Sequence, residues 1–179
     1  MRPIRVLDYD PIWPALFQAM KAELLAMAGV GIVAIEHIGS TAVPGLAAKP
    51  KIDLDTVLVD ETAVSDLAAS LRASGFRDYG DLHGEGRRLL TREHDAHGLR
   101  LYLCLRDNPA HRDRLLFRDH LRRHPERAAE YQALKRRLAI VAEGDWDLYT
   151  GGKAQFIAET IRRAESETGM QSPAPGDPR

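Results

Sequence analysis

Residues 37–55 read His-Ile-Gly-Ser-Thr-Ala-Val-Pro-Gly-Leu-Ala-Ala-Lys-Pro-Lys-Ile-Asp-Leu-Asp and carry the strongest structural signal in the chain. A β-branched run ends at Gly39-Ser40, a loop with proline and glycine follows, and a second apolar run carries Asp53 and Asp55. This pattern predicts two strands joined by a loop. Because residues two apart on a strand share a face, we expect the two carboxylates to lie side by side.

The chemistry of this stretch suits a metal ion and a phosphorylated ligand. Two adjacent carboxylates repel each other unless a cation lies between them, and Mg²⁺ takes one or two carboxylates together with substrate phosphates. Gly39 lets the backbone approach a ligand closely. Ser40 adds a hydroxyl and an N–H that can donate hydrogen bonds to phosphate oxygens. Lys49 is a candidate to bind the negative charge of a polyphosphate. The combination indicates phosphoryl or nucleotidyl transfer, with Asp53 and Asp55 as catalytic residues that bind Mg²⁺ or, alternatively, Mn²⁺.

Hydrophobic periodicity divides the first part of the chain into helices and strands. The expected elements are helices at 11–28 and 62–74 and strands at 31–38, 51–59, 88–91 and 99–106. The short strand at 88–91 is expected at a sheet edge. In the strand 99–106, four leucines alternate with Arg100, Tyr102 and Cys104, which therefore share the opposite face. The fold class is α/β (α+β), a mixed sheet flanked by helices.

The second part of the chain is expected to be helical. The expected helices span 110–123, 125–142 and about 152–164, and the proline-rich end after them is expected to be a disordered tail. We therefore expect an α/β core over 1–106, a helical part over 107–167 and the tail over 168–179. The segment 106–137 holds ten basic and five acidic residues, so the helical part presents a basic surface to the acidic centre. The alternative is a set of solvated helix faces.

Composition excludes several classes of protein. The formal net charge of the 179 residues is −1, which argues against a protein that coats DNA or a membrane surface. The single cysteine, Cys104, excludes an intrachain disulfide. No apolar run approaches the length of a membrane span, and the first residues lack the apolar core of a signal peptide. We expect a cytoplasmic protein that does not bind membranes or nucleic acid; homo-oligomerisation is left open.

The stretch 36–50, Glu-His-Ile-Gly-Ser-Thr-Ala-Val-Pro-Gly-Leu-Ala-Ala-Lys-Pro, resembles the signature of the GrpB family. That family is similar to the nucleotidyltransferase superfamily of the DNA polymerase beta kind, whose motif is Gly-Ser, about a dozen residues, then Asp-x-Asp. Here twelve residues separate Ser40 from Asp53. The resemblance extends along nearly the whole chain, through Tyr-Asp-Pro-Ile-Trp at 9–13, Leu-Phe-Arg-Asp-His-Leu-Arg at 116–122, His-Pro at 124–125, Tyr131, Leu-Lys at 134–135, Tyr149, Gly-Lys at 152–153 and Phe-Ile at 156–157.

The resemblance implies which residues would hold a nucleotide. Asp53 and Asp55 would be the metal pair, and Gly39 and Ser40 would hold the triphosphate. By analogy with related transferases, basic residues of the helical part would approach the phosphates, and an aromatic residue would contact the base or sugar. The candidates are Arg118, Lys135 and Lys153 for the phosphates and Tyr131 or Tyr149 for the base or sugar. The implied function is Mg²⁺-dependent transfer of a nucleoside monophosphate from a nucleoside triphosphate to a small-molecule acceptor.

One departure from the superfamily keeps a second function open. The superfamily usually supplies a third carboxylate from a later strand, but residues 98–105 contain none, and Arg100 stands near a position where the family more often has histidine. Either a neighbour such as Glu93 or His97 takes that role, or the chain binds nucleotide without turning it over. Similar domains occur fused to dephospho-coenzyme A kinases, which suggests a non-catalytic module linked to coenzyme A metabolism.

Three histidines outside the Asp53–Asp55 pair are candidate ligands or pocket residues. His120 and His124 are four residues apart on one helical face, but the residues between them are Leu-Arg-Arg, and two arginines would repel a cation. We therefore do not expect a zinc site there. His37 either lines the pocket or is a strand histidine with its hydrogen bonds satisfied.

Overall fold

The computed structural model describes residues 4–28, 31–94 and 97–169. Its centre is a five-stranded mixed sheet with the order β1-β2-β5-β4-β3. The strands are β1 (Ile32–Ile38), β2 (Lys51–Leu58), β3 (Arg77–Asp78), β4 (Arg87–His94) and β5 (His97–Leu105). Strand β2 pairs parallel with β5, and the other neighbouring pairs are antiparallel. Strand β2, with its two aspartates, therefore lies between β1 and β5.

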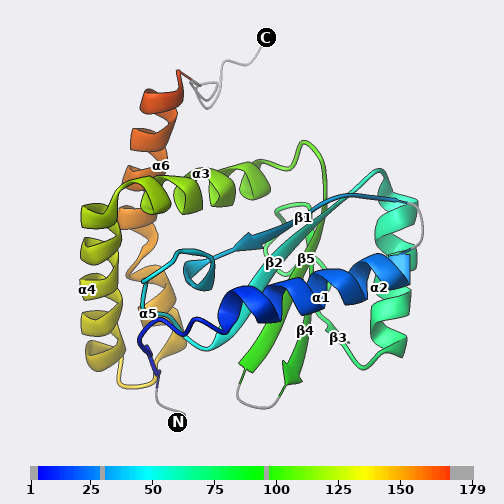
Figure 1. The fold of residues 1–179 in the computed structure, drawn as a ribbon, viewed down its shortest axis with the longest axis horizontal. Helices are drawn as coiled ribbons and strands as arrows, with labels where there is room; N and C mark the ends of the chain where they lie inside the picture. The colour runs from blue at the N-terminus through cyan, green and yellow to red at the C-terminus, as the bar shows by residue number, and fades with distance from the viewer. Residues whose placement is uncertain (1–3, 29–30, 95–96, 170–179) are drawn as a thin grey trace.

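Helices occupy both sides of this sheet (Figure 1). They are α1 (Trp13–Ala28), the short 3-10 helix η1 (Ser40–Ala42), α2 (Glu61–Ala73), α3 (Pro109–Arg123), α4 (Pro125–Val141), α5 (Trp146–Gly151) and α6 (Ala154–Thr168). Helices α1 and α2 lie together over one region of the sheet, and α3 to α6 form a second group. Among the helices of this second group, α3 packs most extensively against α6.

The main hydrophobic core lies between the sheet and the helices α1 and α2. Alternate residues of β2, Ile52 and Leu54, point into it together with Leu101 and Leu103 of β5. Trp13 and Leu24 of α1 close the core from the other side, and both are at most 1% exposed. Burying these side chains is the main favourable term for this half of the fold.

The opposite face of the sheet is polar and faces α3. Asp53 and Asp55 of β2 pair in register with Arg100 and Tyr102 of β5, so these side chains share the face as the alternating pattern predicted. Apolar contact there includes a small cluster that contains Tyr102 and Leu115 of α3. The sheet therefore presents its charged residues to the helical part of the chain.

Most expected elements are confirmed, with shifts of one to four residues at their ends; the two-residue strand β3 was not expected, and other features also differ. The strand expected at 88–91 is the longer β4 and is not at the edge, because β3 pairs with its outer side. Helix α5 was not expected, because its six residues are too few to show a helical period. Helix α1 starts at Trp13, two residues after the expected start, while Asp10 accepts a hydrogen bond from the Ile12 amide. The expected tail over 168–179 begins too early, because Thr168 is the last residue of α6 and Gly169 ends the helix; residues 170–179, like the expected helix stop at Gly29, lie outside the described residues.

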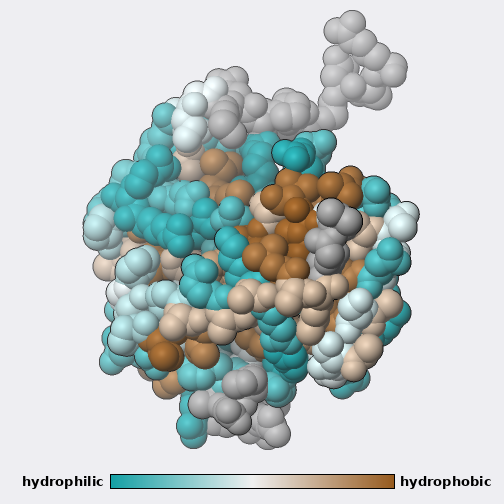
Figure 2. Space-filling model, turned by 45° about the vertical axis from the view of Figure 1, so that its right-hand side comes forward, coloured by the Kyte–Doolittle hydropathy of each residue, from teal (hydrophilic) through white to brown (hydrophobic). Residues whose placement is uncertain are grey.

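Hydrophilic residues cover much of the face shown in Figure 2, with a group of apolar residues among them. The large apolar side chains that are exposed come from several elements, and they include Leu25, Val59, Ile140 and Val141. In the described parts of the chain, none of the helices has the length and apolar character needed to cross a membrane.

Candidate functional site

Gly39 directly follows β1 and lies against Asp53. Its φ of 72° and ψ of −171° belong to a backbone region that is open essentially only to glycine. A Cβ at this position would lie 2.8 Å from Oδ2 of Asp53, because the preceding residue, Ile38, pairs with Asp53 across the sheet. Glycine is therefore required here by both conformation and space.

Ser40 opens η1 and is held by the helical part of the chain. Nζ of Lys135 in α4 donates a hydrogen bond to Oγ of Ser40 over 2.9 Å, and it also donates to the carbonyl of Ala47. Lys135 is only 2% exposed. Burial, together with repulsion from Lys153 and Lys49, lowers the pKa of Lys135 to about 7. Two residues that were both expected to contact the phosphates, Ser40 and Lys135, are thus in direct contact with each other.

Two further lysines lie over the aromatic rings of α5. Nζ of Lys49 is 4.5 Å from the centre of the Trp146 ring and 4.9 Å from that of Tyr149, and Nζ of Lys153 is 4.4 Å from the Tyr149 centre. Such distances allow cation–π attraction. Burial is the largest cause that lowers the pKa of each lysine to about 8; repulsion from Lys153 adds to it at Lys49, and repulsion from Arg100 adds to it at both lysines.

Asp53 is the acidic centre of this group of cations. Burial raises its pKa, while attraction to Arg100, Arg114 and Lys49 opposes that effect. One carboxylate is therefore surrounded by several basic side chains. We call Lys49, Arg100, Lys135 and Lys153 the basic cluster; its charge exceeds what Asp53 neutralises.

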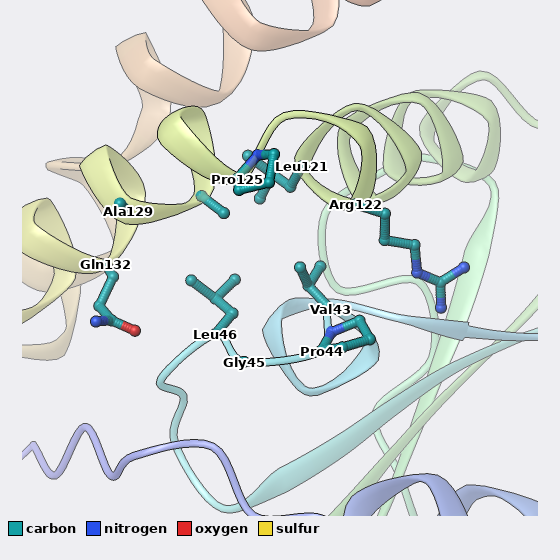
Figure 3. Close-up of a pocket in the computed structure, with 10 residues that line it drawn as sticks. Val43, Pro44, Gly45, Leu46, Leu121, Arg122, Pro125, Ala129 and Gln132 are labelled. Atoms are coloured by element: carbon teal, nitrogen blue, oxygen red, sulfur yellow. The ribbon is translucent and has the colours of Figure 1, made fainter.

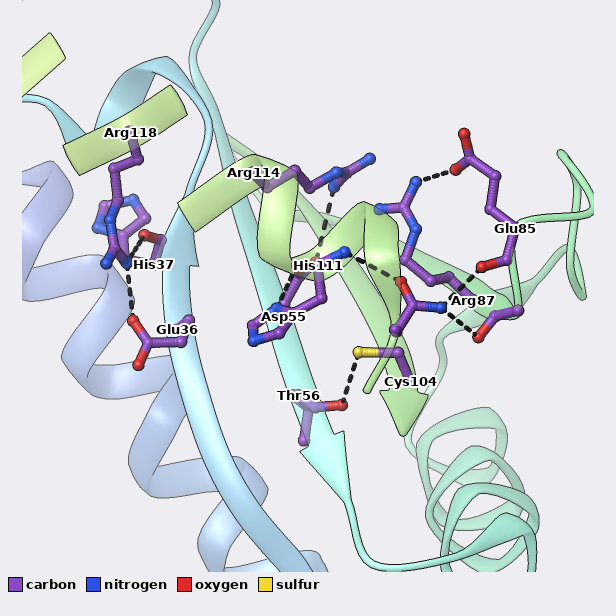
Figure 4. A network of polar contacts seen from close by, with 12 residues as sticks. Glu36, His37, Asp55, Thr56, Glu85, Arg87, Cys104, His111, Arg114 and Arg118 are labelled. Atoms are coloured by element: carbon purple, nitrogen blue, oxygen red, sulfur yellow. Dashed lines mark hydrogen bonds and ion pairs between the residues drawn. The ribbon is translucent and has the colours of Figure 1, made fainter. Parts of the chain in front are cut away.

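Asp55, two residues along β2, has a different environment. It is completely buried, and its Oδ2 lies 2.9 Å from Nδ1 of His111. Its Oδ1 lies 3.6 Å from Nη1 of Arg114, which packs over the Tyr102 ring. Figure 4 shows both partners reaching Asp55 from α3. Asp55 thus ties the sheet to the helical part.

As placed, these residues do not fit a Mg²⁺ ion held jointly by Asp53 and Asp55. The ion needs free carboxylate oxygens and room for several waters. One oxygen of Asp55 contacts His111, and the other faces a guanidinium. In the described ranges, the residues that could together hold a metal ion lie elsewhere, at His120, His124 and Glu167.

Comparison with known proteins identifies relatives over nearly the whole chain. The family described as GrpB protein matches residues 3–163. The chain belongs to the GrpB family. The crystal structure of conserved protein GrpB from Enterococcus faecalis superposes with a TM-score of 0.82 at 29% identity, covering 92% of this chain and 99% of that one. The mixed α+β fold is therefore confirmed by a family member.

Curated relatives of this GrpB-family chain include proteins of different length. UPF0157 protein YqkA of Bacillus subtilis is 35% identical over 164 residues, which cover 92% of this chain and 48% of YqkA. A dephospho-CoA kinase of Mycolicibacterium paratuberculosis is 28% identical over 90% of this chain and 46% of its own length. The chain therefore spans about half the length of each of these two relatives.

The other residues expected at the site, Arg118, Tyr131 and Tyr149, lie away from solvent or outside the basic cluster. Arg118 donates to Oε2 of Glu36 over 2.7 Å and to the carbonyl of His37 over 2.9 Å (Figure 4). Tyr131 is 5% exposed and packs in an apolar cluster with Leu46, and Tyr149 is 1% exposed beneath the lysines. The structure thus brings Gly39, Ser40, Lys49, Asp53, Lys135 and Lys153 together. It places Arg118 in an ion pair and Tyr131 in an apolar cluster, with the Tyr131 ring 4.8 Å from Nζ of Lys135.

Of the two residues considered in place of the third carboxylate, His97 is the first residue of β5 and Glu93 lies in β4. Glu93 is exposed and lies 3.6 Å from Lys51, whereas Arg100 takes the place beside Asp53. His37 is a satisfied strand histidine, because its Nε2 lies 3.0 Å from Oγ1 of Thr41 and its ring stacks on Phe17. Burial, with repulsion from nearby arginines, lowers the pKa of His37 to about 4.

Four residues of this site were missed in the sequence. Glu36 pairs with Asp55 across β1 and β2, which the alternation of β1 could have indicated. His111, Arg114 and Trp146 come from helices whose position relative to the sheet no local pattern records. Trp146 is 42% exposed and lies against Lys49.

A separate cavity of about 500 Å³ lies between the loop after η1 and the start of α4. Figure 3 shows Val43, Pro44 and Leu46 on one side and Leu121, Pro125 and Gln132 on the other. Its lining is mainly apolar and contains no member of the basic cluster. Charged ligands are therefore better matched by the basic cluster than by this cavity.

Proposed function

We propose that this GrpB-family chain binds a nucleoside triphosphate, with the phosphates on the basic cluster beside Gly39 and Ser40. The observation that carries the proposal is the gathering of three lysines and Arg100 around Ser40 and Asp53: Lys135 is buried and contacts Ser40, while Lys49 and Lys153 are half-buried and interact with Asp53. Lys49, Lys135 and Lys153 are more than half removed from solvent, and each has a pKa below its usual range. Like charges are costly to hold together unless an anion accompanies them.

A phosphate chain suits the cluster for electrostatic reasons. Its oxygens accept charge-assisted hydrogen bonds from ammonium groups, and these bonds are stronger than neutral ones. Binding would favour protonation of the lysines and relieve their mutual repulsion. The carboxylate of Asp53 repels phosphate oxygens. We therefore expect the phosphate chain to contact the basic side chains at positions away from this carboxylate.

Trp146 supplies a surface for the nucleobase. Its indole is partly exposed and lies beside Lys49, whereas both candidate tyrosines are buried. An exposed aromatic ring stacks on any base without distinguishing among them. Trp146 therefore replaces Tyr131 and Tyr149 as the proposed contact to the base.

Nucleotidyl transfer to a small-molecule acceptor is the second candidate function. It is favoured by the contact between Gly39 and Asp53, which places a carboxylate next to the proposed phosphate site. The buried ion pairs of Asp55 favour binding without turnover. The similarity to dephospho-CoA kinases supports a link of such a binding module to coenzyme A metabolism, and both candidates suit a cytoplasmic location.

Calorimetric titration with ATP, CTP, GTP and UTP, with and without Mg²⁺, tests the proposal. We expect Lys153→Ala and Lys49→Ala to weaken triphosphate binding by about tenfold to a hundredfold, because each removes a charge-assisted contact. Arg137→Ala is the matched control, since Arg137 is exposed on α4 and outside the cluster. Equal losses in all three variants would show that basic residues inside and outside the cluster contribute equally to binding. That result would contradict a specific site.

A pyrophosphate-release assay on the same samples separates the two functions. Binding without pyrophosphate release across a panel of acceptors supports the module. Release that depends on Mg²⁺ and is lost in Asp53→Asn supports the transferase. No binding of any of the four nucleotides would contradict both.

A further inference from the structure

A second group of polar side chains lies far from the basic cluster, where α3, α4 and α6 meet. His120 is in the last turn of α3, His124 lies between α3 and α4, and Glu167 is in the last turn of α6. Nδ1 of His120 is 3.3 Å from Oε2 of Glu167, and Nε2 of His124 is 3.1 Å from Oε1. One ligand atom from each of the three residues lies within 4.8 Å of the other two.

We propose that His120, His124 and Glu167 bind a transition-metal ion, with Zn²⁺ the best match, and that the ion joins the end of α6 to the α3–α4 junction. Two imidazoles and a carboxylate are a common zinc ligand set, and they leave a fourth position for water. The site is independent of the proposed nucleotide site.

The separations between Glu167 and each histidine agree with tetrahedral coordination. Zinc–nitrogen and zinc–oxygen bonds of about 2.0–2.1 Å place neighbouring ligand atoms about 3.3 Å apart. Oε2 of Glu167 lies 3.3 Å from Nδ1 of His120 and 3.3 Å from Nε2 of His124, which matches this value, whereas the two histidine rings are stacked and their ligand atoms are within 4.8 Å of each other. Small side-chain rotations would therefore suffice to receive the ion.

The surroundings of the two histidines also favour a metal. Nδ1 of His120 is buried and lies 3.3 Å from Oε2 of Glu167, without the alignment of a good hydrogen bond. Nδ1 of His124 lies 3.2 Å from Oε1 of Glu126. When Nδ1 carries the proton and donates it to this carboxylate, the lone pair of Nε2 faces Glu167, which is the usual outer-shell arrangement at zinc.

Arg122 and Arg123, which lie between the two histidines in the sequence, repel a bound cation less strongly than the sequence alone predicted. Arg122 turns away and donates to the carbonyl of Ala42 over 2.9 and 2.7 Å. Arg123 remains near, with Nη2 3.7 Å from Oε2 of Glu167. The adjoining cavity of about 600 Å³ is lined by four glutamates and three arginines, so its charge does not exclude a divalent ion, and it provides access.

Titration of the untagged, chelator-treated protein with Zn²⁺ and with Co²⁺ tests the site. We expect one ion per chain and, for Co²⁺, the intense visible absorption of a four- or five-coordinate ion. His124→Gln and Glu167→Gln should each weaken binding at least tenfold, since each removes one of three ligands. Both side chains are about one-third exposed, so these variants are expected to fold, which circular dichroism checks. His83→Gln, in an exposed loop, is the matched control.

Thermal unfolding gives a second readout. Zn²⁺ should raise the Tm of the wild type and of His83→Gln, but not that of Glu167→Gln, because only an ion held by both α6 and α3 stabilises their contact. Absence of binding up to 100-fold molar excess of Zn²⁺ would overturn the proposal. So would binding that is unchanged in both ligand variants, which would place the ion elsewhere and leave the three residues as a histidine–glutamate ion pair.

Discussion

Gly39 is the residue on which the geometry of the nucleotide site depends most directly. Gly39→Ala forces a Cβ to within 2.8 Å of Oδ2 of Asp53 and places alanine in a backbone region that disfavours it. We expect a loss of about 1–3 kcal/mol in the free energy of unfolding, measured by urea denaturation. We also expect weaker triphosphate binding, because either Asp53 or the backbone beside Ser40 must move.

Gly45 provides the control for this prediction. Its φ of +78° is similar, but a Cβ there meets no atom within 4 Å. Gly45→Ala should therefore lower stability through its backbone conformation and leave triphosphate binding unchanged. If the two variants bind triphosphate equally well, the contact between Gly39 and Asp53 does not shape the site.

The pKa of Lys135 predicts how stability varies with pH. Its folded-state pKa of about 7 lies below the usual value of 10.5, so between these values the unfolded chain binds more protons than the folded one. Stability should therefore rise with pH from about 7 toward 10, while below pH 7 the cost of burying the charged lysine is fully present. Urea denaturation at several pH values should show a smaller rise for Lys135→Met than for the wild type.

At the scale of elements, the contact between β2 and α3 depends on Asp55. Asp55→Ala leaves His111 and Arg114 without their buried partner. Removing one member of a buried ion pair typically costs about 3–5 kcal/mol, and we expect that loss in the free energy of unfolding. A double-mutant cycle with His111→Ala measures the coupling between the two. A loss below about 1 kcal/mol, or additive effects, would show that Asp55 does not hold α3 to the sheet.

The elements themselves were largely predictable, and their contacts were not. The alternation of leucines with Arg100, Tyr102 and Cys104 determines both the strand and its two faces. The same pattern predicted that Asp53 and Asp55 share a face. It holds no information about α3, which lies more than fifty residues later and brings His111 to Asp55. The different environments of the two aspartates therefore arise only from tertiary packing.

At the scale of the whole molecule, the site lies where the helical part meets the sheet. Gly39, Ser40, Lys49 and Asp53 come from one stretch, and their proximity follows from the strand–loop–strand pattern. Lys135 and Lys153 were expected to approach the phosphates because of the family resemblance, and the structure places both beside this stretch. Trp146 was missed because α5 is too short to show a periodic pattern.

A crystal structure with a non-hydrolysable nucleoside triphosphate tests the central claim most directly. The account predicts the phosphates within hydrogen-bond distance of Nζ of Lys49 and Lys153, beside Gly39 and Ser40, with the nucleobase on Trp146. A nucleotide bound on another surface, or no bound nucleotide at a concentration that saturates the protein in solution, would contradict it.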